Sequence, residues 1–394
     1  MITPSTALLD PMESPAAVAA EIGEQVAAPA ADDVDTAARF PTEALGAVRA
    51  AGLLGALVPE ELGGPGRSMT ELAQAVTALS EHCASSGIVL AMHGIQVASI
   101  VRHASPATLE RVIPGLLSGE LLLASANSEV GLYGNRRVST CALEPTASGF
   151  RLEKHASCVS YGEAADAVLA TARRRPDSPP NEQVLAICVA PNMTLEPIGE
   201  WNTLGLRGTD SRPFILTAEL PPELVIEDYG TVFAQTALPA SSILLSSVWL
   251  GIAEGAARRA HTAVRSQARK LRAADPDAPP PPSALRLAEL AVILHQMRAM
   301  IAFGAAEYER MKDTPEVSTI GFSALMDNVK VSTSTLVADV VRRAMGVCGM
   351  GGFANDTPTS LARLSRDAAG APLMVNNERA LIAAAQSLLL RKDL

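Results

Sequence analysis

The sequence predicts a mostly α-helical protein with a β-domain in the middle of the chain. Helical periodicity dominates before residue 120 and after residue 236, and short apolar runs bounded by Pro, Gly or Asp occupy the stretch between them. The chain has 394 residues and is 48% hydrophobic, which suits a large core shared by two or three packed units. Because helices, strands and helices follow one another in blocks, we expect segregated α and β layers.

The first predicted unit is an N-terminal helical domain over residues 1–120. It opens with one weak helix from Ala16 to Ala28. The apolar run from Gly55 to Val58 has the composition of a short strand. Stronger helical patterns occupy roughly 41–52, 69–84, 86–104 and 107–118.

The second predicted unit is a β-domain over residues 121–236. The clearest strands are Ala167–Ala172, Val184–Val189 and Phe214–Leu220. The polar stretch RRRPDSPPNEQ at 173–183 joins the first two of these strands, and we expect it to form an exposed hairpin tip.

The third predicted unit is a helical domain over residues 237–394. A proline-rich connector, DPDAPPPPS, separates its first two helices, and a glycine-rich turn, GVCGMGGFANDTP, follows the third. The four predicted helices are Ser241–Leu271, Ala284–Met311, Phe322–Met345 and Asn377–Leu390.

Charge and composition exclude several classes of protein. The 32 basic and 42 acidic side chains give a net charge of −10, which disfavours a nucleic-acid partner. Five scattered cysteines without a CxxC pair indicate neither disulfides nor a zinc site, and the six histidines show no metal spacing. We see no secretory leader and no apolar window long enough to span a membrane, so the expected location is the cytoplasm.

Residues Phe40 to Gly131 carry the most specific pattern in the chain. They include FPTEALGAVRAAGLLGALVPEELGGPG, then LSEHCASSG, then LLASANSEVG. This series resembles the opening of the acyl-CoA dehydrogenase superfamily, and the resemblance continues over roughly residues 36–390. It implies an N-terminal helical domain, a middle β-barrel or sandwich and a C-terminal four-helix bundle. It also implies an FAD cofactor and assembly as a homodimer or homotetramer.

The resemblance implies one set of cofactor contacts at the start of the β-domain. The family's Thr-Glu-Pro-Gly segment, which meets the flavin pyrimidine, matches the segment that ends at Gly131, with Val130 in place of the proline. Gly134-Asn135 matches the next family element, near the pyrophosphate. The alternative is a simple turn capped by Ser128. The implied pyrimidine contacts are Ala126, Asn127 and Ser128.

Further implied contacts lie on the next strand pair and in the C-terminal domain. Ser160 matches a position facing flavin N5, and Cys158 replaces the tryptophan that usually covers the ring; the alternative is a buried apolar cysteine. Arg265 matches an arginine that reaches the cofactor of a neighbouring subunit, although a solvated arginine is the alternative. The glycine-rich turn before Arg366-Asp367 implies contacts from Gly349, Gly351 and Gly352.

The turn from Trp201 to Ser211 also matches a family element. It belongs to the predicted β-domain, and we expect Arg207 to pair within that domain.

The catalytic base of the family is missing. Removal of the α-proton of an acyl thioester needs a carboxylate, but Val375 occupies the expected position. The alternative position used by some members falls on Ser241 or Ser242. Glu378, one helical turn after Val375, is the remaining candidate; its alternative role is a charge at a helix N-terminus.

Three functions remain open. The leading one is an FAD-dependent dehydrogenase that acts on an acyl thioester of CoA or a carrier protein, with an electron-transfer flavoprotein or oxygen as acceptor. The second is a flavin-dependent monooxygenase or N-hydroxylase of the same fold. The third is a family member without catalytic activity.

Overall fold

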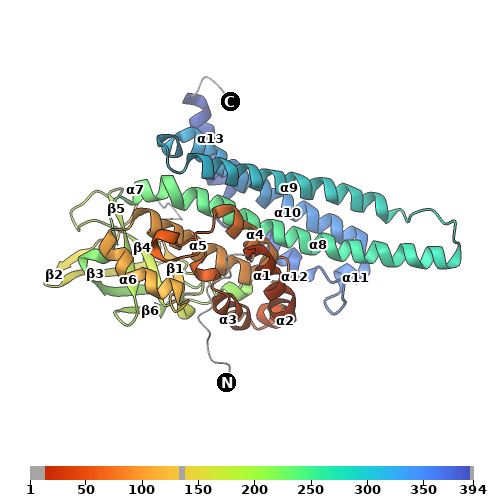
Figure 1. The fold of residues 1–394 in the computed structure, drawn as a ribbon, viewed down its shortest axis with the longest axis horizontal. Coiled ribbons are helices and arrows are strands. Elements are labelled where there is room, and N and C mark those ends of the chain that lie inside the picture. The colour runs from red at the N-terminus through yellow and green to blue at the C-terminus, as the bar shows by residue number, and fades with distance from the viewer. Residues whose placement is uncertain (1–13, 133–137, 391–394) are drawn as a thin grey trace.

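The computed structural model describes residues 14–132 and 138–390, and it has the predicted order of helices, strands and helices. Figure 1 shows the strands gathered at one end of the molecule, while three long helices extend together away from them. The fold is that of the acyl-CoA dehydrogenases: helical regions on both sides of a middle β-region.

In the N-terminal region, the described residues from 14 onward form six α-helices. The predicted weak helix is longer than expected, because a π-helical turn over Gly23–Ala27 joins α1 to α2. Ser68 and Glu71 form a capping box at the start of α4, and Ser105 caps α6. The helices are α1 (Pro15–Ile22), α2 (Ala28–Thr36), α3 (Thr42–Ala50), α4 (Met69–Ser80), α5 (Ala84–His103) and α6 (Pro106–Leu117).

Two four-stranded sheets form the middle region, with strand orders β1-β4-β5-β8 and β2-β3-β7-β6. Among the strand pairs of the described residues, β1–β4 is parallel and the others are antiparallel. The 173–183 segment joins β4 to β5 as a turn, as predicted. The strands are β1 (Leu123–Ala126), β2 (Glu144–Thr146), β3 (Gly149–Ala156), β4 (Ala167–Arg173), β5 (Gln183–Val189), β6 (Met193–Pro197), β7 (Phe214–Leu220) and β8 (Val225–Ile226).

The C-terminal region is helical again, and its first helix begins at Tyr229, inside the stretch assigned to the β-domain. The helices α8, α9 and α10 pack along one another, and α13 packs against α10. The bounds are α7 (Tyr229–Val232), α8 (Leu238–Ala274), α9 (Ser283–Met311), α10 (Ile320–Cys348), α11 (Met350–Phe353), α12 (Ala362–Gly370) and α13 (Asn377–Leu390).

Two local predictions were wrong. The Gly55–Val58 run is not a strand: a 3₁₀ turn covers Leu53–Gly55, and it follows Gly52, whose φ is 72°. This run pairs with no strand among the described residues, so local turn geometry prevails. Within the glycine-rich turn, Met350–Phe353 forms the short helix α11.

The expectation that no window could span a membrane was also wrong by length and composition. Among the described residues, three helices are long and apolar enough: α5, the continuous helix Tyr229–Ala274, and α9. The apolar windows of the first two are 89% and 94% buried inside the protein, and that of α9 is 33% buried. A helix enclosed on all sides by protein is apolar all round, which accounts for the first two.

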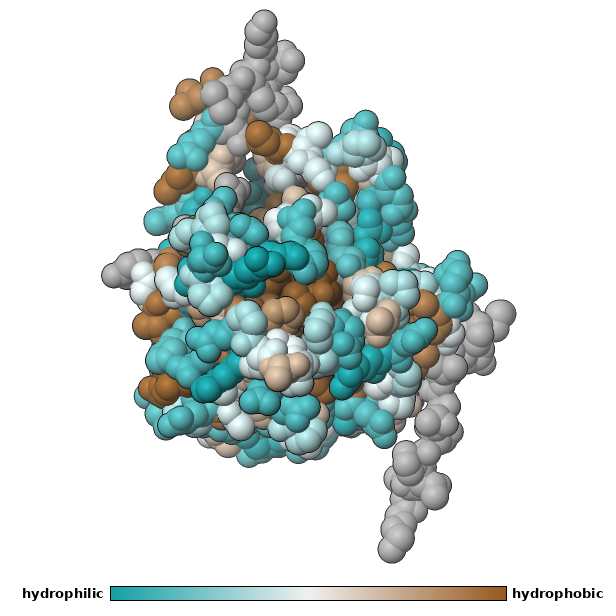
Figure 2. All heavy atoms as spheres, turned by 90° about the vertical axis from the view of Figure 1, so that its left-hand side faces the viewer, coloured by the Kyte–Doolittle hydropathy of each residue, from teal (hydrophilic) through white to brown (hydrophobic). Residues whose placement is uncertain are grey.

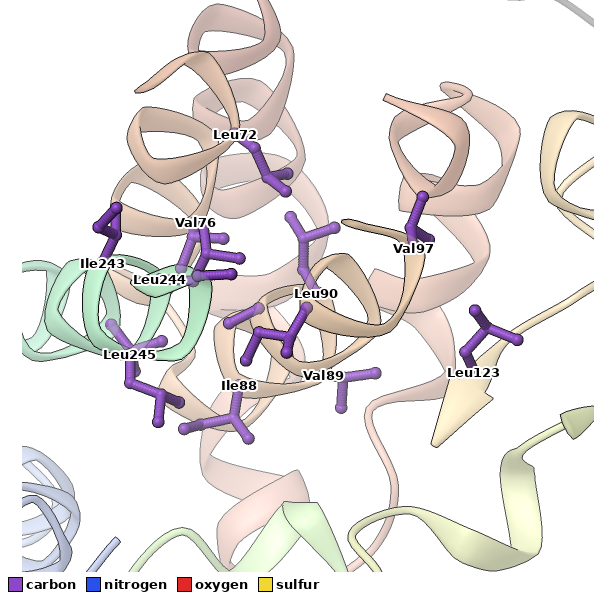
Figure 3. Packing of buried hydrophobic residues seen from close by; sticks show 14 of the residues in the cluster. Leu72, Val76, Ile88, Val89, Leu90, Val97, Leu123, Ile243, Leu244 and Leu245 are labelled. Carbon is purple, nitrogen blue, oxygen red and sulfur yellow. The ribbon is translucent and has the colours of Figure 1, made fainter. Parts of the chain in front are cut away.

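The hydrophobic core is continuous from the helices into the β-region. Figure 3 shows Leu72 and Val76 of α4 and Leu244 of α8 around the central helix α5, with Leu123 of β1 beside it. Burying each such side chain contributes about 1.5–3 kcal/mol. The core therefore fixes β1 against α5, and β1 leads directly into the 126–131 segment.

Two buried polar side chains fix the position of β1. His93 on α5 accepts the Leu123 amide at Nδ1 (3.0 Å) and donates from Nε2 to the Leu54 carbonyl (2.9 Å). The Tyr161 hydroxyl donates to the Leu123 carbonyl at 2.8 Å. Burial lowers the pKa of His93 to about 4, although the bond to Leu54 opposes this change. The neutral imidazole is therefore the form that joins the helix to the strand.

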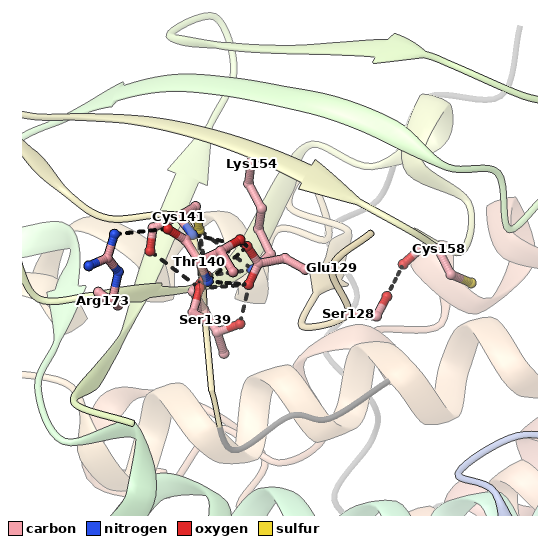
Figure 4. A network of polar contacts seen from close by, with 9 residues as sticks. Ser128, Glu129, Ser139, Thr140, Cys141, Lys154, Cys158 and Arg173 are labelled. Carbon is pink, nitrogen blue, oxygen red and sulfur yellow. Dashed lines mark hydrogen bonds and ion pairs between the residues drawn. The ribbon is translucent and has the colours of Figure 1, made fainter. Parts of the chain in front are cut away.

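A buried carboxylate organises the loop that follows β1. Glu129 accepts bonds from the hydroxyls of Ser139 and Thr140 and from the Cys141 amide, and Lys154 Nζ lies 3.2 Å away (Figure 4). Burial alone raises the pKa of Glu129, but Lys154 and these donors outweigh it and hold the pKa below its usual range. Glu129 is thus ionised and ties its loop to β3.

We expect His93 to make folding pH-dependent. An exposed imidazole has a pKa near 6.5, so the unfolded chain takes up this proton first. The contribution of neutral His93 to the free energy of unfolding is complete above pH 6.5, and it is lost as the pH falls towards 4. Between pH 7 and pH 5 the loss is about 2 kcal/mol. Urea unfolding at pH 7 and pH 5 measures the free energy of unfolding. Between these pH values the free energy of unfolding should fall by about 2 kcal/mol less for His93→Gln than for wild type. His295→Gln, at an exposed position, should match wild type; an unchanged slope for His93→Gln contradicts the assignment.

We expect Glu129→Gln to destabilise the protein by about 3–5 kcal/mol, because it leaves the buried Lys154 ammonium without its carboxylate. Adding Lys154→Met should recover part of this loss. The exposed neighbour Glu153 offers a control, since Glu153→Gln should cost under about 1 kcal/mol. Urea denaturation at pH 7 measures all four proteins, and a loss below about 1 kcal/mol for Glu129→Gln would show that the pair is not structural.

Candidate functional site

A cavity of about 770 Å³ lies where the β-region meets the helices. Its volume falls within the range of about 300–1,000 Å³ that is usual for small-molecule sites. Five separate parts of the chain form its walls: α5, the loop that follows β1, the loop that follows β3, the turn between β6 and β7, and the segment from α12 to α13. No single sequence motif therefore contains the site.

Much of the lining is apolar. Ile88 and Met92 from α5 form one part of it, and the 201–206 turn and the 369–375 segment form others. Such a lining excludes water and suits the faces of a flat aromatic ring. The apolar lining residues are Ile88, Met92, Trp201, Leu204, Leu206, Ala369, Leu373, Met374 and Val375.

A few polar groups interrupt this lining. Asn127 Oδ1 is buried and has no hydrogen-bond partner among the described residues. Buried acceptors are rarely left unsatisfied, so this atom is available to a ligand. The Ser128 hydroxyl, beside it, donates to the Cys158 carbonyl at 3.3 Å (Figure 4).

Three hydroxyls form a chain in the wall. Thr209 Oγ1 lies 2.8 Å from Ser211 Oγ, and Ser211 donates to Ser160 Oγ at 2.8 Å. In this direction of donation, Ser160 keeps its own proton for a ligand in the cavity.

The charges in the lining are all positive. Among the described lining residues, Arg366 and Arg379 carry charge, and none is an aspartate, glutamate or histidine. Arg366 also pairs with Asp35 of α2. The cavity can therefore bind an anion, but its lining offers no carboxylate base.

Three of the carboxylates adjacent in sequence to lining residues are engaged elsewhere or exposed. Glu129 is held by Lys154 and its loop. Asp367 is buried behind the wall and accepts the Leu206 amide at 2.7 Å. Burial raises the pKa of Asp367 to about 6, with Arg363 acting in the opposite direction. Glu378 is exposed in the first turn of α13 and does not line the cavity.

The structure brings together some of the predicted site residues. Asn127, Ser128, Cys158 and Ser160 line the cavity, as does Val375 at the expected base position. Their individual roles remain predictions.

Other predicted residues lie outside this cavity. Ala126 is buried in β1, and Arg265 is exposed on α8. Gly349, Gly351 and Gly352 lie at the end of α10 and in α11, and Ser241 and Ser242 are buried in α8. The predicted pyrophosphate contacts Gly134 and Asn135 lie outside the described residues.

Sequence reasoning missed the contribution of the 201–211 turn to the cavity and, apart from Val375, that of the 366–379 segment. The prediction for Arg207 was incomplete. It donates to the Thr203 carbonyl within the predicted β-domain, and also to the carbonyls of Asp35 (2.7 Å) and Thr36 (3.4 Å) in α2, outside that domain. Gly205 was the available sequence signal for a close contact between the 201–211 turn and the 366–379 segment, because a Cβ there would lie 2.2 Å from the Arg366 carbonyl oxygen.

The outer surface shows a further apolar region. Figure 2 shows apolar side chains at the top, where α13 lies in Figure 1, above a largely hydrophilic face with an apolar recess near its centre. On α13 the exposed large apolar residues are Leu381, Ile382, Leu388 and Leu389. Among the described residues, no group of three His, Cys, Asp or Glu side chains is placed to hold a metal ion.

Comparison with known sequences identifies two matching family models. The acyl-CoA dehydrogenase N-terminal domain matches residues 13–120, and the acyl-CoA dehydrogenase C-terminal domain matches residues 228–374. The amino sugar nitrososynthase DnmZ of Streptomyces peucetius is 25% identical, over 85% of this chain and 82% of that protein. Cyclohex-1-ene-1-carbonyl-CoA dehydrogenase of Syntrophus aciditrophicus is 28% identical, over 61% of this chain and 59% of that protein.

Solved structures share the fold at lower identity. FMN-bound TdsC from Paenibacillus sp. A11-2 superposes with a TM-score of 0.81 at 22% identity, covering 96% of this chain and 97% of that one. Butyryl-CoA dehydrogenase from Megasphaera elsdenii gives 0.80 at 21%, covering 99% and 100%. KijD3 in complex with FMN and a dTDP-linked amino sugar gives 0.79 at 22%, covering 100% and 98%. With both terminal domains matched and the fold shared throughout, the chain belongs to the acyl-CoA dehydrogenase superfamily, whose members are flavin-dependent oxidoreductases.

Proposed function

We propose that this chain is a flavin-dependent monooxygenase, with an amine or aromatic compound as the substrate class. The observation that carries the proposal is the cavity lining, in which no described residue is a carboxylate. Val375, which we predict to occupy the family's base position, is part of this lining. A dehydrogenase cannot remove an α-proton without such a base, whereas oxygen insertion does not require one there.

The cavity fits the flavin ring. Its volume and apolar walls suit a tricyclic aromatic system. The unpartnered Asn127 Oδ1 can accept the N–H of the pyrimidine ring, and the Ser128 and Ser160 hydroxyls lie on the same lining. Arg379, whose guanidinium has no partner among the described side chains, and Arg366 supply positive charge for a phosphate.

We keep FAD as the predicted cofactor, with a second copy of the chain completing its site. Arg265, Gly349, Gly351 and Gly352 do not line the cavity of their own chain, and we propose that they contact a cofactor bound by another copy. Exposed apolar residues on α9 and α13 support a homodimer or homotetramer. We also propose a cytoplasmic location and no nucleic-acid or membrane partner.

Reduced flavin, when bound, supplies the two electrons with which one atom of molecular oxygen enters the substrate and the other leaves, with two protons, as water. The chain contributes an apolar lining, which includes Met92 and Met374 and would exclude water from the face of a bound ring. Ser160 holds a hydroxyl proton that it can donate within the cavity. Oxygen is the proposed electron acceptor, and a separate reductase would supply the electrons.

Two relatives support this choice over an acyl-thioester dehydrogenase. One is named an amino sugar nitrososynthase, and one solved neighbour is described as holding FMN together with a dTDP-linked amino sugar. We therefore rank N-hydroxylation first, and desaturation of an acyl thioester of CoA or a carrier protein second.

We expect Asn127→Ala to weaken flavin binding about tenfold, because it removes the acceptor for the ring N–H. Fluorescence titration with FMN and with FAD measures the dissociation constants. Asn192→Ala, in the exposed turn between β5 and β6, is the matched control and should bind like wild type. Tighter binding of FAD than of FMN would support completion by a second copy. Equal binding by both variants contradicts the role of Asn127.

We expect Glu378→Gln to leave turnover within about twofold of wild type, because this carboxylate lies outside the cavity. Photoreduced FMN, ¹⁸O₂ and a panel of aromatic amines and amino sugars should give ¹⁸O in a product. Anaerobic mixing of the oxidised holoprotein with acyl-CoA thioesters should leave the flavin band unbleached. Bleaching that Glu378→Gln abolishes would establish the dehydrogenase instead. A chain that binds no flavin would be the non-catalytic member.

A further inference from the structure

The wall segment between α12 and α13, residues 371–377, has an unusual backbone. Val375 adopts φ of 51°, in the left-handed region that β-branched residues rarely enter. Such a conformation persists only when the surroundings enforce it. The segment carries Leu373, Met374 and Asn376, as well as Val375, into the lining of the cavity. Whatever enforces the conformation of Val375 therefore also shapes the cavity.

Lys330 on α10 holds this segment from behind. Its ammonium donates to the Val375 carbonyl (2.6 Å), to Asn377 Oδ1 (2.7 Å) and to the Ala371 carbonyl (3.2 Å). The residue is only 1% exposed. One buried cation thus binds the beginning, the strained position and the end of the same seven-residue wall.

A second contact strengthens this arrangement. Ser334, one turn further along α10, donates to the same Asn377 Oδ1 at 3.0 Å. If the Val375 carbonyl turned away, the buried ammonium would lose one of its acceptors, which is costly inside a protein. The hydrogen bonds of Lys330 therefore stabilise the left-handed conformation of Val375.

We propose that Lys330 is a positioning residue that keeps the 371–377 wall in the shape required for the ligand of the cavity, an inference that rests on the proposed flavin site. Lys330 does not line the cavity itself. It acts through Val375, at the position where the family resemblance places the catalytic base. Lys330 therefore helps to shape a pocket whose described lining contains no carboxylate.

The test compares Lys330→Met with Lys312→Met, a lysine paired with Glu309 on the surface of another helix. We expect Lys330→Met to raise the dissociation constant for FMN about tenfold. We also expect it to speed hydrogen exchange at the amides of Leu373, Met374 and Asn377, which are hydrogen-bonded in the wall. Lys312→Met should change neither quantity.

The Val375→Gly background separates positioning from general stability. Glycine adopts a positive φ without help, so in this background Lys330→Met should raise the FMN dissociation constant less than about threefold. The same fold-change in both backgrounds would overturn the proposal, as would FMN binding within about twofold of wild type by folded Lys330→Met.

Two further outcomes also decide. If Lys330→Met alone does not fold, the double variant with Val375→Gly should fold and bind FMN, and its failure to fold overturns the proposal. If wild-type protein binds neither FMN nor FAD, the proposed function fails separately. Hydrogen exchange then tests whether Lys330 positions the 371–377 wall. Faster exchange of the wall amides in Lys330→Met supports this role, and unchanged exchange overturns it.

Discussion

A buried hydrogen bond joins two walls of the cavity. Asp367 on α12 accepts the amide of Leu206, in the turn between β6 and β7, at 2.7 Å. This contact fixes the position of the β-region turn relative to the C-terminal helices. On either side of it, Arg366 pairs with Asp35 and Arg207 donates to the Asp35 carbonyl, so α2 is bound to the same junction. The cavity exists because three regions distant in sequence are held together by these polar contacts.

The chemistry follows from what this junction leaves in the lining. Its polar groups are hydroxyls, amides and two arginines, and its remaining surface is apolar. Such a lining can bind a flat ring and an anion, and it can exclude water, but it cannot remove a carbon-bound proton with a carboxylate. This lining supports our proposal of oxygen chemistry in place of desaturation.

Much of the fold could be predicted from periodicity. The helix Asn377–Leu390 and the strand Phe214–Leu220 were predicted with the bounds that the structure shows. Several cavity residues were also predicted, because the segment containing Asn127 and Ser128 resembles a family motif. The remaining lining residues could not be found in this way, since Met92, Leu204 and Arg366 meet only through tertiary contacts.

The position of Glu378 illustrates the same limit. Spacing along the chain places it one helical turn from Val375, but α13 begins at Asn377 and turns the glutamate outward, while Arg379 reaches the lining. The left-handed backbone of Val375, held by Lys330, sets the direction in which the helix leaves the wall. No sequence pattern reveals a backbone angle imposed by a buried lysine on another helix.

The central claim is that a flavin ring lies between the loop after β1 and the 371–377 wall. Crystals grown with FMN test it most directly. The account predicts electron density for the tricyclic ring beside Asn127 and Met374. A cavity closed by side chains, or a flavin bound at another surface, would contradict it.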